Sequence, residues 1–115
     1  MAIERIGPSE IMHSVVAKDG TLYLGGITAK DTTGDMYVQT KDLLERADSI
    51  LASAGSSKQQ LLSAVIFITD FAQKPKMNQA WAEWLNPSDM PARTTVGVAQ
   101  LGPGELVEIS FTAGR

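Results

Sequence analysis

Two residues near the end of the chain combine a fixed cation with a group that can transfer a proton. Arg93 lies in the segment 91–96, and Glu108 follows it fifteen residues later. A guanidinium can bind a carboxylate through two parallel hydrogen bonds, and a glutamate can act as a general acid or base. The two side chains therefore outline a small-molecule site if the fold brings them together.

The spacing predicts that both residues lie on one β-hairpin. Segments 92–99 and 105–112 alternate apolar and polar residues, as half-buried strands do. Residues 101–104 between them read Leu-Gly-Pro-Gly, a turn sequence. This hairpin would pair Gly97 with Glu108 and place Arg93 four residues along the neighbouring strand.

The alternation also predicts which side chains share a face. If the apolar positions of the hairpin contact helices, Arg93, Thr95 and Gly97 lie on the opposite face together with Glu108. The glycine would leave an open space beside the carboxylate. The alternative interpretation is a solvated ion pair, which is common on a sheet surface and contributes little stability.

The rest of the chain supplies the elements that must position this hairpin. Apolar periodicity predicts a β-β-α-β-α-β-β order in one α+β domain, residues 1–115, with both helices on one face of the sheet. The predicted elements before the hairpin are strands at 14–16 and 21–27 joined by Asp19-Gly20, a helix at 37–54, a strand at 61–70 and a helix at 76–85.

Composition excludes several classes of function. The net charge is −3, so no basic field favours nucleic acid or an anionic membrane. The chain has no cysteine and one histidine, His13, which excludes thiolate and multi-histidine metal sites. No apolar stretch approaches the length of a membrane span. We expect a cytoplasmic protein that needs no metal or cofactor.

Other candidate residues carry weaker signals. Gly25 and Gly26 end a predicted strand, where glycines mark a bulge or a close approach to the backbone. His13 is more often structural than catalytic in such a position. Trp81 and Trp84 lie on one stripe of the second helix and are predicted to pack on the sheet, and Asn78 can reach past them.

The sequence resembles a known family over nearly its whole length. The matching segments are 91–98 with Leu101 and 107–109, the strand 20–26, and residues 68–70 with 77–81. They are similar to the reactive-intermediate deaminase family, called Rid or YjgF and also endoribonuclease L-PSP. The resemblance implies a chorismate-mutase-like α+β fold with a mixed sheet, assembled into a homotrimer with sites in the clefts between subunits.

For activity, the resemblance implies hydrolysis of 2-imino acids of the 2-iminobutanoate and 2-iminopropanoate type, or of their enamine tautomers, to 2-keto acids and ammonia. Arg93 would hold the substrate carboxylate, and Glu108 would orient and deprotonate the attacking water. Backbone groups of Gly25 and Gly26 from a neighbouring subunit would contact the ligand, with Asn78 farther out.

Several positions differ from the family pattern. Thr95 stands where many members have a cysteine or a small polar residue, Gly97 where an acidic residue is usual, and Gly25-Gly26-Ile27 where Ser-Gly-Gln is usual. The early aromatic that packs over the substrate falls near Met12-His13, so His13 is a candidate for its role. The alternative is therefore a non-catalytic trimer that binds a small carboxylate or regulates an enzyme. RNA cleavage is disfavoured by the acidic balance and the lack of a histidine pair.

Overall fold

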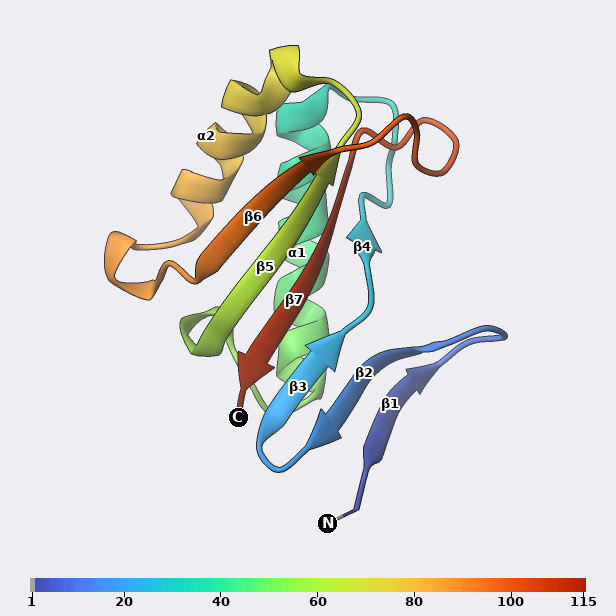
Figure 1. Cartoon of the computed structure of the whole chain (residues 1–115), viewed down its shortest axis with the longest axis vertical. Coiled ribbons are helices and arrows are strands. Elements are labelled where there is room, and N and C mark those ends of the chain that lie inside the picture. Colours follow the sequence, from blue (N-terminus) through green and yellow to red (C-terminus); the bar gives the residue numbers. More distant parts are fainter. Residues whose placement is uncertain (1) are drawn as a thin grey trace.

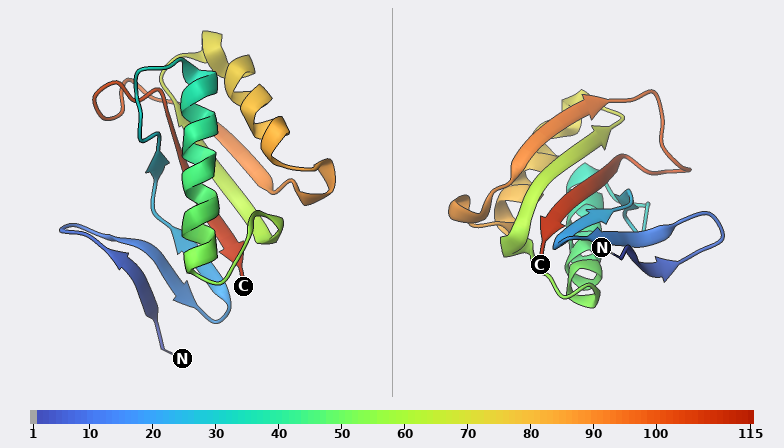
Figure 2. Two further views of the ribbon diagram at one scale, coloured as in Figure 1. Left: turned by 180° about the vertical axis from the view of Figure 1, so that it is seen from behind. Right: turned by 60° about the horizontal axis from the view of Figure 1, so that its bottom comes forward.

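The computed structural model describes residues 2–115, and in this range seven strands form one sheet with two helices on one of its faces (Figure 1, Figure 2). The helices are α1 (Met36–Ser53) and α2 (Lys74–Trp84), and short 3-10 turns lie at Lys58–Gln60, Phe71–Gln73 and Pro87–Asp89. The strands are β1 (Glu4–Pro8), β2 (His13–Lys18), β3 (Thr21–Leu24), β4 (Ile27–Thr28), β5 (Leu61–Ile68), β6 (Ala92–Gly97) and β7 (Val107–Gly114).

The sheet is mixed and runs in the order β1-β2-β3-β7-β5-β6, with β4 paired to β7 beyond the end of β3. Strands β5 and β6 are parallel, and the other pairs are antiparallel. The α+β class and the placement of both helices on one face are confirmed. Strands β1 and β4 were not predicted, because β1 carries a single apolar residue, Ile6, and β4 has only two residues.

Local sequence explains how the elements begin and end. Asp19 and Gly20 both have positive φ, 53° and 80°, as the two central residues of a type I′ turn require. This turn matches the twist of β2 and β3 and fixes their register. Asp35 caps α1 by accepting a hydrogen bond from the backbone N–H of Val38, 3.0 Å away. Gly55, with φ of 75°, follows the helix.

The predicted hairpin between β6 and β7 is wrong. Strand β5 lies between them, parallel to β6 and antiparallel to β7. Residues 98–106 do not turn back on β6 but cross the end of β5, as Figure 1 shows. The physical reason is that β5 is apolar on both faces and needs a hydrogen-bonded strand on each side. Inserted between β6 and β7, this strand is paired along both edges and lies inside the sheet.

The core lies between the sheet and the helices. Phe111 of β7 is almost fully buried and stacks on Trp81, with ring centroids 6.1 Å apart. Trp84 packs on the same phenylalanine at 5.9 Å. The predicted packing of both tryptophans against the sheet is therefore confirmed. No helix in residues 2–115 has both the length and the apolar character needed to cross a bilayer.

We expect Phe111→Ala to destabilise the fold by about 3–5 kcal/mol, because it opens a cavity beneath both tryptophans. Urea unfolding followed by tryptophan fluorescence measures this loss, at one fixed chain concentration. Phe71→Ala is the matched control, since that ring is 53% exposed. An equal loss in the two variants would contradict the core assignment.

Candidate functional site

Arg93 projects from β6 towards α2, on the same face of the sheet as the helices. The register of the sheet aligns it with Ala64 and Phe111, two core residues. Its guanidinium carbon lies 5.4 Å from the centre of the Trp81 ring, and Nη1 is 3.9 Å from the sulfur of Met77. Burial against these groups lowers the pKa of Arg93, although a guanidinium remains protonated at neutral pH.

Arg93 has no acidic partner. Within residues 2–115 the ion pairs join Lys76 to Asp35 and Arg115 to Glu4, and neither includes this guanidinium. A partly buried cation without a counter-charge favours binding of an anion. The structure therefore leaves a half-buried guanidinium without a counter-charge at the edge of the sheet.

Asn78 supplies a second polar group without a partner, on the helix that Arg93 contacts. It follows Met77 in α2, and its Oδ1 is buried without a hydrogen-bond partner in the described part of the chain. An amide oxygen accepts hydrogen bonds, so Asn78 can receive one from an N–H or O–H donor of a ligand. Its helix is the one that contacts Arg93.

Glu108 lies on the opposite, uncovered face of the sheet. It is half-buried on β7, between Thr28 of β4 and Phe67 of β5. Its carboxylate packs directly over Gly26, so closely that a Cβ atom at that position would collide with it. Gly26 therefore provides the space that the Glu108 side chain occupies, the close approach that the glycine pair indicated.

Gly25 faces the other way and contacts Met12. A Cβ atom at Gly25 would collide with the end of the methionine side chain. A cavity of about 270 Å³ lies beside this segment, and its walls include Met12, Gly25, Gly26 and Arg46. His13 pairs with Pro8 and is half-buried, and it is not one of the residues that line this cavity.

The predicted face of Arg93, Thr95 and Gly97 is wrong. Thr95 aligns with Ile66, and Gly97 with Ile68, so both residues share the helix-covered face with Arg93. The space above Gly97 is filled by the ring of Phe71, not left open beside Glu108. The cause is the parallel pairing of β6 with β5, which replaces the register that the hairpin would have had.

The structure thus separates the candidate residues. Gly26 and Glu108 lie together on the open face of the sheet. Arg93 lies on the helix-covered face, against the helix α2 that also carries Asn78. One chain alone does not bring Arg93 and Glu108 together.

Sequence reasoning missed Gln39, Phe71 and Met77. Gln39 is fully buried at the start of α1, three residues after Met36 and four before Leu43, on the helix stripe that faces the core. That polar residue at an apolar position was the available signal. No sequence pattern indicated that Phe71 would cover Gly97 or that Met77 would contact Arg93.

Three kinds of similarity agree with this architecture. The family described as endoribonuclease L-PSP matches residues 3–114. A "RutC family protein" from Haemophilus influenzae is 36% identical over 114 residues, covering 98% of each chain. A protein from Acinetobacter baylyi named 3-aminoacrylate deaminase RutC is 36% identical over 101 residues, covering 83% of this chain and 79% of its own.

A solved structure from Neisseria meningitidis, described as a member of the YjgF protein family, superposes with a TM-score of 0.95. It is 31% identical, and the alignment covers 100% of this chain and 96% of that one. The family match at residues 3–114 extends over every strand and both helices. The chain belongs to the endoribonuclease L-PSP family, the YjgF or Rid family that its sequence resembles.

Proposed function

We propose that this protein is an imine and enamine deaminase that hydrolyses 2-imino acids of the 2-iminobutanoate and 2-iminopropanoate type to 2-keto acids and ammonia. The observation that carries the proposal is the unpaired guanidinium of Arg93, half-buried between Trp81 and Met77. A relative is named for the deamination of 3-aminoacrylate, which is an enamine that also bears a carboxylate.

The chemistry uses groups that the chain supplies. Arg93 binds the substrate carboxylate through two hydrogen bonds and fixes the imine carbon in place. Glu108 removes a proton from a water as the water oxygen bonds to the carbon of the protonated imine, giving a carbinolamine. Glu108 then returns this proton to the amino group. The C–N bond breaks and ammonia leaves. The hydroxyl gives its proton to Glu108 as the keto group forms, and ammonia takes this proton away as ammonium.

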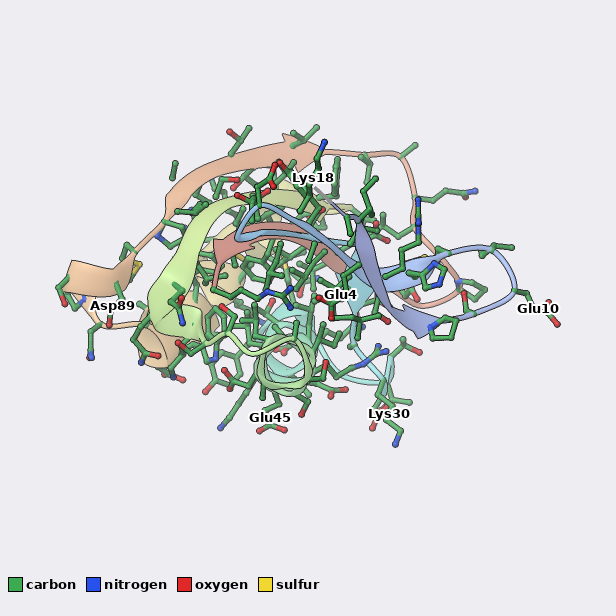
Figure 3. The ribbon with its side chains drawn as sticks, turned by 90° about the horizontal axis from the view of Figure 1, so that it is seen from below. Glu4, Glu10, Lys18, Lys30, Glu45 and Asp89 are labelled. Carbon is green, nitrogen blue, oxygen red and sulfur yellow. The ribbon has the colours of Figure 1, made fainter. Side chains whose placement is uncertain are left out.

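The site needs a second copy of the chain, because Arg93 and Glu108 lie on opposite faces of one sheet. The face that carries Glu108 has no helix over it, and Tyr23 and Val65 on it are 55% and 36% exposed. Figure 3 shows α1, with Glu45 on its outer side, on one side of the curved sheet only. An apolar uncovered sheet face favours burial against another subunit. We propose a homotrimer with its sites between subunits.

The activity is tested with an imino acid made in situ by an L-amino-acid oxidase and trapped with semicarbazide. The deaminase should reduce the amount of trapped adduct in proportion to its concentration. If no imino acid in a panel responds while small carboxylates still bind by calorimetry, the protein is a carboxylate-binding trimer and the deaminase proposal fails.

Mixed subunits test whether the site is shared. Arg93→Ala and Glu108→Gln chains, each inactive alone, are unfolded together in equal amounts and refolded. In a cyclic trimer every mixed assembly contains one site with both native residues, so we expect about a quarter of the wild-type activity to return. A site within one chain would recover none. Refolded wild-type protein is the control for yield.

The assembly is also tested directly by sedimentation equilibrium. We expect about three times the chain mass of 12.3 kDa. Val65→Asp, on the open face, should shift the mass towards that of one chain, because it buries an unpaired carboxylate in the contact. Val38→Asp is the matched control, since Val38 is exposed on α1. A wild-type mass of 12.3 kDa would exclude the trimer.

A further inference from the structure

Gln39 makes an unusual set of contacts for a helix residue. It is fully buried, and both ends of its amide are hydrogen-bonded to backbone groups. Oε1 accepts from the N–H of Leu106 at 2.9 Å, and Nε2 donates to the carbonyl of Gly104 at 3.0 Å. Nε2 also lies 3.1 Å from the carbonyl of Gly34 and 3.2 Å from that of Thr32. One side chain thus satisfies groups from two loops.

One of these two loops follows β4, and the other precedes β7, the strand that carries Glu108. Thr32 and Gly34 lie in the segment that leaves β4, and β4 follows directly after Gly26. Gly104 and Leu106 lie in the segment that leads into β7. Leu106 directly precedes Val107, the first residue of that strand. Glu108 pairs with Thr28 of β4, so the distance between the two strands sets how its carboxylate sits over Gly26.

The loop before β7 has few other fixed points. Residues 98–106 contain no strand or helix. The Glu105 carboxylate accepts from the N–H of Gly102 at 2.9 Å, which closes a turn within the loop itself. The carbonyl of Leu106 accepts from Thr69 N–H at the end of β5. Thr32 packs on Gly104, and among the hydrogen bonds of residues 2–115 those of Gln39 alone join this loop to the loop that leaves β4.

We propose that Gln39 is a positioning residue for Glu108: its buried amide holds β4 and β7 at the spacing that places the carboxylate over Gly26. The expected effect on kcat rests on the proposed function, but the expected effect on the position of the Glu108 carboxylate does not. Arg93 lies on β6 at the other side of β5, and none of the hydrogen bonds of Gln39 reaches β6, so we expect carboxylate binding to change little.

The test compares Gln39→Met with two controls. Methionine has nearly the same volume but cannot make any of the four hydrogen bonds. We expect kcat to fall by about tenfold and KM to stay within about twofold, because the water is misplaced while the substrate is still held. Gln39→Glu is the second variant if the first does not fold, since it keeps the oxygen that accepts from Leu106.

The controls separate positioning from simple loss of stability. Thr40→Val alters the next residue, which is also fully buried and whose hydroxyl makes no hydrogen bond in the described chain. Leu51→Ala destabilises α1 at its far end. Both should keep the wild-type kcat at a temperature where they are folded. If Leu51→Ala lowers kcat as much as Gln39→Met does, Gln39 has only a structural role.

Hydrogen exchange supplies a readout that does not need activity. In Gln39→Met the amide of Leu106 should exchange about tenfold faster or more, while amides in the middle of β7 keep their protection. The carboxyl resonance of Glu108 should shift as its position changes. Unchanged exchange and an unchanged resonance would overturn the proposal. If the wild type is inactive but Gln39→Met still shows both the faster exchange and the shifted resonance, the deaminase function is refuted and the positioning role stands.

Discussion

Glu108→Gln is expected to lower kcat by about 100-fold or more, because the amide keeps the size of the side chain but cannot take a proton from water. KM should stay within about threefold, since the substrate carboxylate is held by Arg93. The rate measurement is loss of the semicarbazide-trapped adduct at saturating imino acid. The fold should survive, because Glu108 is half-buried and makes no ion pair in residues 2–115.

A second glutamate gives the matched control. Glu105 lies three residues earlier, in the loop before β7, and its carboxylate accepts a hydrogen bond from Gly102 N–H. Glu105→Gln keeps an oxygen for that bond and should leave kcat nearly unchanged. An equal fall in kcat in Glu105→Gln and Glu108→Gln would show that the substitutions disturb the loop and not the proton transfer. A Glu108→Gln enzyme with full activity would remove Glu108 from the mechanism.

Periodicity predicted the helices and the strands that build the layers. The apolar stripes of α1 and α2 require a cover, and β5 is apolar enough to predict a central strand, so the α+β class followed from local patterns. The Asp19-Gly20 turn is equally local, because positive φ at both positions depends on residue type alone. These features are determined by neighbours in sequence.

Strand pairing could not be predicted in the same way. The segment between β6 and β7 contains turn residues, and a hairpin satisfies the alternation of both strands as well as the observed arrangement does. The position of β5 between the two strands decides between them, and strand order is a property of the whole sheet. The consequence is large, since the parallel pairing moves Arg93 to the helix-covered face, away from Glu108.

The candidate site residues were selected one by one from the sequence, whereas their grouping depended on the predicted strand pairing. Arg93 and Glu108 were selected for their functional groups and Gly26 as a sign of close approach to the backbone, and the structure gives each a distinct environment. The grouping of Arg93 and Glu108 in one hairpin was an error of pairing. Gln39 was missed because a glutamine on a helix is ordinarily solvated, and its partners lie in loops distant in sequence. Long-range hydrogen bonds leave no periodic signal.

Arg93→Ala is expected to lower kcat/KM by about 100-fold, equivalent to about 2.7 kcal/mol, because the substrate carboxylate loses its only fixed cation. Arg93→Lys should recover part of this loss, since an ammonium keeps the charge but not the two-pronged geometry. The decisive comparison uses an imine without a carboxylate. On that substrate wild type and Arg93→Ala should react at similar low rates, because the guanidinium has nothing to bind. If Arg93→Ala were equally damaging on both substrates, the arginine would support the packing of Trp81 and Met77 and not the carboxylate.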